Sequence, residues 1–235
     1  LTIGAPTNAG VGATNVHTLT ITDDDATPTV EFTAAMQSVG EGAGTATITA
    51  QLSAASGLPV TVPYGVAGDA TDPDDYTLAP NPIVIPAGMT TADVTVTLVG
   101  DLLDENDETV VLTIGAPTNA GVGATNVHTL TINDDDATPT VDFTAAAQAV
   151  SEGAGTATIT AELSAASGLP VTVPYAVSGD ATDPDDYTLA PNPIVIPAGS
   201  TTADVTVTLA GDLLDENDET VVLTLSLIHI SEPTR

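Results

Sequence analysis

The stretch that decides the fold runs from residue 45 to residue 52 and reads Thr-Ala-Thr-Ile-Thr-Ala-Gln-Leu. Apolar side chains occupy every second position, and polar side chains fill the positions between them. Successive side chains of a strand point to opposite faces, so a two-residue period is typical of a strand with one buried face. The stretch therefore predicts a half-buried β-strand rather than an amphipathic helix.

The sequence repeats itself. Residues 1–16 and 112–127 are identical, and the agreement extends over residues 1–112 and 112–223 with ten substitutions, so the period is 111 residues. This period divides the chain into the tail of one repeat (residues 1–27), a complete repeat (28–138) and a repeat that lacks its end (139–224). We expect a fragment of a longer tandem array.

Other short segments of the complete repeat carry the same alternation as residues 45–52. Ile83 and Ile85 lie between Pro82 and Pro86, which favours an edge strand. Clusters of Gly, Pro, Asn and Asp separate the segments at turn-like spacing. About seven short strands per repeat, with no helical period, predict tandem antiparallel β-sandwiches of immunoglobulin-like architecture. The other alternating segments are 30–32, 60–66, 94–98, 110–114 and 130–132.

Residues 225–235, Leu-Ser-Leu-Ile-His-Ile-Ser-Glu-Pro-Thr-Arg, break the period. The string resembles the in-frame translation of a transposase adapter from sequencing-library preparation, so we leave it out of the fold expectations. It contains Glu232 and Arg235. Without it the chain has 31 acidic residues and no lysine or arginine.

The composition excludes several classes of function. The formal net charge is −31, cysteine is absent, and hydrophobic residues still make up 42% of the chain. That apolar content argues against disorder. The lack of basic residues excludes nucleic-acid binding through phosphate neutralisation and disfavours anionic membrane surfaces. The absence of cysteine also excludes disulfides, thiolate metal sites and thiol catalysis. We expect no membrane insertion, because no apolar run approaches about 18–20 residues.

The acidic residues of the complete repeat form four clusters, each at the end of an expected strand. Loops at strand ends gather at the two ends of a sandwich, so several clusters can converge. Like charges about 4 Å apart repel by about 4 kcal/mol at an effective dielectric constant near 20, and a divalent cation relieves this. Calcium prefers six to eight oxygen ligands. The clusters contain Glu41; Asp72, Asp74 and Asp75; Asp101, Asp104, Glu105, Asp107 and Glu108; and Asp134, Asp135 and Asp136.

Local motifs alone leave two interpretations of these clusters open. No EF-hand loop and no glycine-rich nonapeptide repeat is present. The acids are then either metal ligands or a solvated, solubilising surface like that of acidic halophilic proteins.

The order of sequence blocks in the complete repeat resembles the Calx-beta domain, the calcium-binding β-sandwich of sodium–calcium exchangers and of many large bacterial surface proteins. The resemblance covers the complete repeat and both partial ones. The blocks are Val-x-Glu-Gly-x-Gly-Thr (39–45), Pro-Val-Thr-Val-x-Tyr (59–64), Asp-Tyr-Thr (75–77), Ile-x-Ile-x-Ala-Gly-x-Thr-Thr (83–91), Asp-x-x-x-Glu-x-Asp-Glu-Thr (101–109) and Leu-Thr-Ile-x-Asp-Asp-Asp (130–136).

The resemblance implies a calcium site at one tip of the sandwich. In the complete repeat its implied ligands are Glu41, Asp75, Asp101, Glu105, Glu108, Asp134, Asp135 and Asp136. One acid of the family pattern is replaced by Gly100. The third repeat keeps Glu152, Asp186, Asp212, Glu216 and Glu219, and the first keeps Asp23, Asp24 and Asp25. One complete and two partial sites are therefore expected.

Other residues carry weaker signals. His17 and His128 occupy equivalent positions beside apolar strand residues, and we interpret them as strand-end or partly buried residues and not as metal ligands, because calcium prefers oxygen ligands. An ice-binding face would keep one spacing of threonines from strand to strand. The spacing of the Thr-x-Thr stretches changes between strands, so we do not expect such a face. Ser53 and Ser56 have no His–Asp partner nearby in sequence, so no enzyme is expected.

Together these observations predict a calcium-binding structural repeat of a large extracellular or cell-surface protein, bacterial in origin, acting as an adhesin-like stalk that calcium stiffens. Its expected partners are calcium ions and neighbouring repeats. Two alternatives remain: a regulatory calcium sensor of a transporter, and an acidic spacer without a specific ion site.

Overall fold

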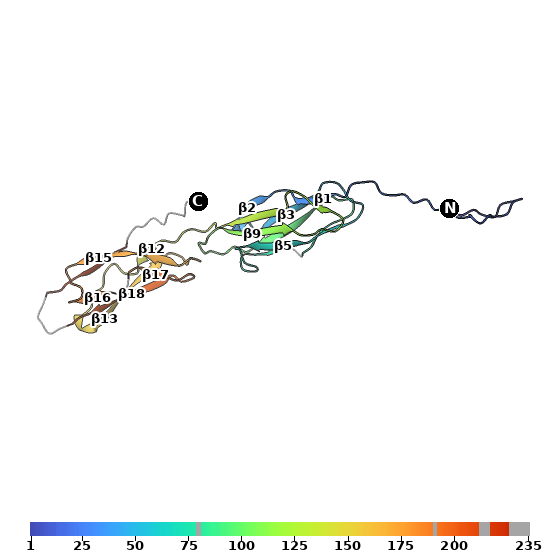
Figure 1. The fold of residues 1–235 in the computed structure, drawn as a ribbon. Coiled ribbons are helices and arrows are strands. Elements are labelled where there is room, and N and C mark those ends of the chain that lie inside the picture. The colour runs from blue at the N-terminus through green and yellow to red at the C-terminus, as the bar shows by residue number, and fades with distance from the viewer. Residues whose placement is uncertain (79–80, 190–191, 212–216, 226–235) are drawn as a thin grey trace.

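The chain forms two β-sandwiches that follow one another, with an extended arm at the N-terminus (Figure 1). The structure, a computed structural model, describes residues 1–78, 81–189, 192–211 and 217–225. The two 3-10 turns, Glu41–Ala43 (η1) and Glu152–Ala154 (η2), are the only helical segments among them. None of these residues belongs to a helix long and apolar enough to cross a membrane. The predicted all-β class is confirmed.

One sheet of the complete repeat is built around residues 45–52, the stretch with the strongest alternation. This strand, β3, pairs antiparallel with β8 from Thr45↔Thr97 to Gln51↔Thr91. The order across the sheet is β10-β1-β3-β8-β6. Its strands are β1 (Thr29–Phe32), β3 (Thr45–Leu52), β6 (Tyr76–Leu78), β8 (Thr91–Leu98) and β10 (Gly121–Val122).

The opposite sheet has the order β2-β11-β9-β5. It carries the strands that lead into two of the acidic clusters: β2 ends at Gly40, directly before Glu41, and β11 ends at Asn133, directly before the Asp triplet. A two-stranded sheet, β4 with β7, completes the repeat. These strands are β2 (Met36–Gly40), β4 (Val60–Val62), β5 (Tyr64–Gly68), β7 (Ile83–Ile85), β9 (Glu108–Ile114) and β11 (Val127–Asn133).

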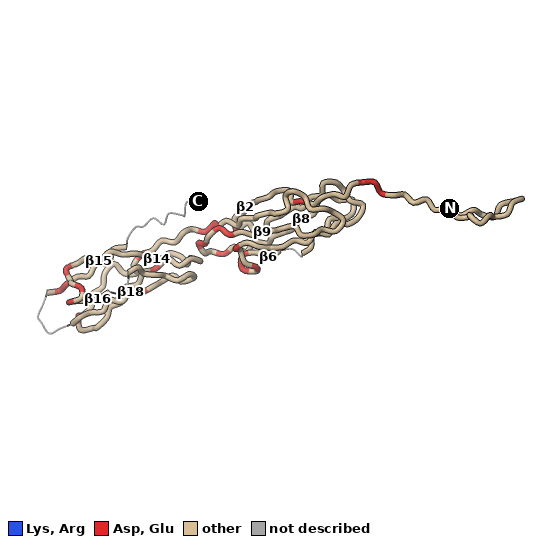
Figure 2. The backbone as a smooth tube through the Cα atoms, viewed as in Figure 1, with Lys and Arg blue, Asp and Glu red and all other residues tan. Residues whose placement is uncertain are grey.

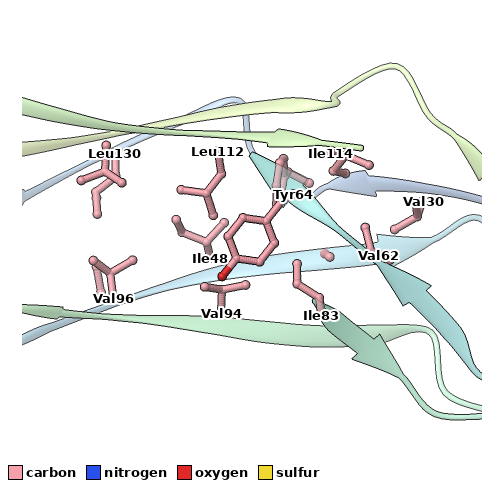
Figure 3. Close-up of a cluster of buried hydrophobic side chains, with 14 of the residues drawn as sticks. Val30, Ile48, Val62, Tyr64, Ile83, Val94, Val96, Leu112, Ile114 and Leu130 are labelled. Atoms are coloured by element: carbon pink, nitrogen blue, oxygen red, sulfur yellow. The ribbon is translucent and has the colours of Figure 1, made fainter. Parts of the chain in front are cut away.

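The core lies between the two sheets and is filled from both (Figure 3). Ile48 and Val94 face it from one sheet and Leu112 and Leu130 from the other, each at most 2% exposed. The ring of Tyr64 lies among these side chains. Burying each aliphatic side chain contributes about 1.5–3 kcal/mol. The core therefore holds the strand ends, and the acidic loops attached to them, in place.

The strands differ in two respects from the expected pattern. Eleven strand segments lie in the described part of residues 28–138, rather than about seven, because one expected segment is divided and three strands, β2, β6 and β10, form where none is expected. The stretch 60–66 divides at Pro63, which has no N–H to donate to a ladder. In addition, β2 pairs with β11 and β1 with β10 in parallel, whereas every other ladder of the repeat is antiparallel.

His128 belongs to the core and is more deeply buried than the strand-end or partly buried residue that the sequence predicts. It is 2% exposed, and its Nδ1 lies 2.7 Å from the carbonyl oxygen of Ala34. Its ring makes an edge contact with Phe32, with 5.8 Å between the ring centroids. His17, its counterpart one period earlier, is exposed in the arm. Residues 1–27 form no named strand, and one isolated bridge joins Thr2 to Val16.

The third repeat keeps the first sheet and loses part of the second among the described residues. Leu223 of β19 is half-buried and faces Val177 across one ladder, whereas Leu112 is fully buried because β11 covers the other side of its strand. The sheets are β12-β13-β18-β16, β14-β17 and β15-β19. The strands are β12 (Val141–Phe143), β13 (Thr156–Leu163), β14 (Val171–Val173), β15 (Tyr175–Gly179), β16 (Tyr187–Leu189), β17 (Ile194–Ile196), β18 (Thr202–Leu209) and β19 (Val221–Leu225).

Candidate metal centre

Acidic segments from distant parts of the sequence meet at one end of the complete repeat, next to the third repeat (Figure 2). The turn η1 follows β2, residues 99–107 join β8 to β9, and the triplet 134–136 follows β11. Because these strands lie in both sheets, the acidic loops come together from both layers of the sandwich. The expectation that the clusters converge therefore agrees with the structure.

Three carboxylates form the centre of this end. Glu41, Asp101 and Asp136 each offer an oxygen, and these oxygens lie within 4.8 Å of one another. Glu41 is only 8% exposed, and its Oε1 accepts a 3.3 Å hydrogen bond from the Asp101 N–H. Burial raises the pKa of Glu41; that hydrogen bond opposes the rise, and the charges of Asp101 and Asp136 add to it.

The Oδ2 atom of Asp136 is buried and has no hydrogen-bond partner in the described part of the chain. A buried carboxylate oxygen without a partner is unfavourable, since ionised groups lose their hydration on burial. The described residues contain no lysine or arginine that could compensate it, since Arg235, the sole such residue of the chain, lies outside them. A metal ion bound at the centre would neutralise the negative charge of these carboxylates.

Two glycines bring Asp135 close to the turn. A Cβ at Gly40 would lie 2.9 Å from the Asp135 Oδ2, and a Cβ at Gly42 would lie 3.0 Å from it. Gly100 packs against the same turn, where its Cβ would lie 3.2 Å from the Glu41 carbonyl carbon. Position 100, where the family pattern has an acid, thus holds a glycine that lies close to the backbone of the η1 turn.

A second acidic pair lies beside the centre. The side chains of Glu108 and Asp75 share a hydrogen bond, and burial, together with that bond, raises the pKa of Glu108 to about 7. Burial would raise the pKa of Asp75 too, but hydrogen bonds from Thr71, at 2.6 Å from its N–H and 2.9 Å from its Oγ1, lower it overall. Glu108 therefore takes up its proton at a much higher pH than an ordinary carboxyl group does.

Glu105 and Asp134 link the centre to this pair electrostatically. Burial, then the charges of Asp101 and Asp75, raise the pKa of Glu105. Burial also raises the pKa of Asp134, against hydrogen bonds from the N–H groups of Asp136 and Glu105. All eight acids that the resemblance implied in the complete repeat thus lie in loops or strand ends at this tip, and three of them form the closest group.

Sequence reasoning missed the acids that position the ligand loops. Asp107 accepts hydrogen bonds from the Asn133 Nδ2 at 2.9 Å and from the Asp134 N–H at 3.2 Å, so it holds the start of the triplet. Asp69 accepts two from Thr109, at 2.6 Å from its N–H and 2.5 Å from its Oγ1. These roles are not visible in a sequence, because the partners are 26–27 and 40 residues away.

A comparison with models of known protein families shows to which family the chain belongs. The model of the Calx-beta domain matches residues 23–136 and again residues 134–234. The chain belongs to the Calx-beta domain family. No curated protein sequence matches it significantly.

Solved structures of Calx-beta domains are similar to this chain. The crystal structure of CBD12 from CALX1.2 is 19% identical over 84% of this chain and 82% of its own, with a TM-score of 0.43. The calcium binding domain CBD12 of CALX1.1 is 19% identical over 78% of this chain and 76% of its own, with a TM-score of 0.44. The membership of this chain rests on the family match and not on these likenesses.

Among the residues that the structure describes, the partial Calx-beta repeats place fewer of their acids together. Asp23, Asp24 and Asp25 are exposed in the arm, and Glu152 is exposed where its counterpart Glu41 is buried. Asp186 accepts hydrogen bonds from Thr182 and shares one with Glu219. Two expected ligands, Asp212 and Glu216, lie outside the described residues.

The donor set of the complete Calx-beta repeat suits calcium. All of its candidate ligands are carboxylates, and calcium takes oxygen ligands in flexible geometry, including bidentate carboxylates. Zinc and copper prefer nitrogen or sulfur ligands, and the buried His128 faces the core instead of this end. Glu41, Asp101 and Asp136 are the residues that would hold the ion.

Proposed function

We propose that the chain is a calcium-binding structural repeat of a large extracellular or cell-surface protein. In this function calcium binds the tip of the complete repeat and stiffens both the domain and the joint to the next repeat. The role is mechanical, that of an adhesin-like stalk, and not catalytic.

The observation that carries the proposal is the unpartnered, buried oxygen of Asp136 beside Glu41 and Asp101. An acidic surface that serves only solubility has no reason to bury a carboxylate oxygen among others of the same charge. A bound divalent cation would turn this repulsion into attraction.

The short connection between repeats supports the stiffening. The Asp triplet ends one repeat, and β12 of the next begins at Val141, so residues 137–140 form the whole linker. Pro139 restricts that linker further through its fixed φ angle. An ion held by Asp136 would therefore immobilise the chain within a few residues of the next sandwich.

A regulatory calcium sensor is the alternative that the family supports, since a related solved structure is the calcium binding domain of CALX1.1. The near-identical neighbouring repeats favour the stalk, because ten substitutions over the period leave the acidic segments unchanged. An acidic spacer without a specific ion site is the second alternative, and calcium titration separates it from the other two.

The test is thermal unfolding of the full chain in calcium and in magnesium at equal ionic strength. Calcium at 100 times its dissociation constant stabilises the repeat by about 2.7 kcal/mol. We expect a higher melting temperature in calcium, and we expect the combined variant Asp101→Ala, Asp135→Ala to abolish the shift. Equal melting temperatures in the two salts would contradict the proposal.

Small-angle scattering on two complete repeats tests the joint separately. We expect a straighter, stiffer particle in calcium and a more bent one in chelator. Equal maximum dimension and equal flexibility in both would refute the hinge and leave calcium binding intact.

A further inference from the structure

A contact between the two repeats lies beside the acidic end and consists of protein groups alone. The carbonyl oxygen of Asp104 accepts hydrogen bonds from the Ser167 Oγ and from the Gly168 N–H, both at 3.1 Å. The carboxylate of Asp104 accepts a third bond from the Thr138 Oγ1, at 3.0 Å. Asp104 thus joins its own loop to the linker and to the next repeat.

The receiving loop of the third repeat is buried by this contact. Ser167 is 1% exposed, although it lies between strands β13 and β14, where a loop would usually face solvent. A Cβ at Gly168 would lie 2.1 Å from the Glu105 Oε1 and 2.7 Å from its Cδ. The Glu105 side chain thus lies directly over Gly168, in the space that a side chain at position 168 would fill.

The complete repeat carries the same loop in the same shape. Residues 52–64 and 163–175 are identical in sequence. Ser56 Oγ accepts a hydrogen bond from the Leu58 N–H at 3.1 Å, and Ser167 Oγ accepts one from Leu169 at the same distance. The carbonyl oxygens of both serines accept bonds of 2.8 Å, from the N–H groups of Gly88 and Gly199.

Only the surroundings of the two loops differ. Ser56 is half-exposed, and a Cβ at Gly57 would meet nothing within 4 Å. The loop therefore has its shape without a partner on it. It is also uncharged, and it presents a hydroxyl and an N–H as donors, which suits the carbonyl oxygen of a strongly acidic loop.

We propose that residues 56–58 and 167–169, which we call the docking loops, are the surfaces on which each repeat receives the acidic loop of the repeat before it. The docking loop of the third repeat receives residues 104–105. The docking loop of the complete repeat is a site for the same Asp-Leu-Leu-Asp-Glu segment of a further copy. The contact is tested in calcium and in chelator, so the proposal is judged apart from calcium binding.

Because the Glu105 side chain can rotate away from one added carbon, the test uses a large side chain and compares Gly168→Trp with its matched control Gly57→Trp. The chain has no cysteine, so Thr95→Cys and Thr206→Cys, at equivalent exposed positions of β8 and β18, accept nitroxide labels. Double electron–electron resonance then reports the distance distribution between the repeats. It is recorded in calcium and in chelator, and the variants are compared within each condition.

We expect Gly168→Trp to lose the distance distribution of the parent chain, whereas Gly57→Trp keeps it. Circular dichroism and the melting temperature verify that both variants are folded. Identical distributions for the two variants, in calcium and in chelator, would overturn the proposal. A calcium-induced change in melting temperature is read in the same samples, so failure of the calcium proposal is seen independently.

A lengthened chain tests the unused docking loop. Placing a copy of residues 28–111 ahead of Leu1 completes the first repeat in the natural period. With labels on the added copy of Thr95 and on Thr95 itself, Gly57→Trp is now expected to change the distance distribution as Gly168→Trp does in the parent chain. An unchanged distribution would overturn the assignment of residues 56–58 as a docking surface.

Discussion

Replacing Asp136 by asparagine is expected to stabilise the repeat without calcium and to weaken its response to calcium. The carboxylate oxygens of Glu41, Asp101 and Asp136 lie within 4.8 Å of one another, so the substitution removes two repulsive pairs. At that distance one pair repels by about 1 kcal/mol in water and about 3.5 kcal/mol at an effective dielectric constant near 20. Although Glu41 is buried, Asp101 is exposed and the Asp136 residue as a whole is half-buried, so the lower figure applies and the expected gain is about 2 kcal/mol.

In calcium the order of stabilities is expected to reverse. The parent chain gains about 2.7 kcal/mol at 100 times the dissociation constant, and the variant loses that gain with one of its three central ligands. In chelator the variant is expected to melt about 8 °C higher than the parent, at roughly 4 °C per kcal/mol for a domain of this size. Calorimetric melting in chelator and in calcium measures both effects.

Asp25→Asn is the matched control for Asp136→Asn, because it removes the same charge at the same position of the period in the exposed arm. It is expected to change neither melting temperature by a measurable amount. A variant Asp136→Asn that is destabilised equally in chelator and in calcium would refute the reasoning, since the carboxylate would then be a structural group and not a ligand in a repulsive cluster.

Three further predictions concern the complete repeat. In chelator its melting temperature is expected to fall as the pH rises from 4.5 to 7. The pKa of Glu108 is raised from 4.5 to about 7 in the folded state, so the stabilising proton is fully bound below pH 4.5 and lost as the pH reaches about 7. A melting temperature that does not change over this pH range would contradict the prediction. His128→Ala is expected to cost about 2–4 kcal/mol in denaturant unfolding, and His17→Ala less than about 0.5, because the first ring is buried and the second exposed. Gly68→Ala is expected to destabilise the repeat, since Gly68 has φ +123° and a Cβ there would lie 2.0 Å from a carbonyl oxygen of β9. A Cβ at Gly65 would have no atom within 4 Å, so the control variant Gly65→Ala should melt at the temperature of the parent chain.

The strand pattern was predictable because burial imposes a period of two on the sequence. Ile48 and its alternate neighbours in β3 are buried as the sequence predicts, and His128 lies in the core. The parallel pairing of β2 with β11 was not predictable. It depends on which edge the chain reaches after Phe32, and alternation describes each strand without describing its partner.

The candidate site was predictable as a set of acids but not as a geometry. The family pattern implied Glu41 and Asp101, and the structure brings them together with Asp136. Long-range backbone contacts decide the rest. Asp107 positions the triplet, and Asp104 contacts the next repeat, although both have the same local sequence signal as the implied ligands. Their partners depend on tertiary structure, so composition and spacing could not separate these two roles.

The central claim is that the tip of the complete repeat binds calcium through the cluster around Glu41. Isothermal titration of calcium into Glu41→Gln and into Glu152→Gln tests it most directly, because the two variants lose the same charge at equivalent positions, one in the buried cluster and one exposed. We expect the Glu152→Gln chain to bind calcium as the parent does and the Glu41→Gln chain to lose that binding. Equal calcium binding by the two variants, or none by the parent, would contradict the account.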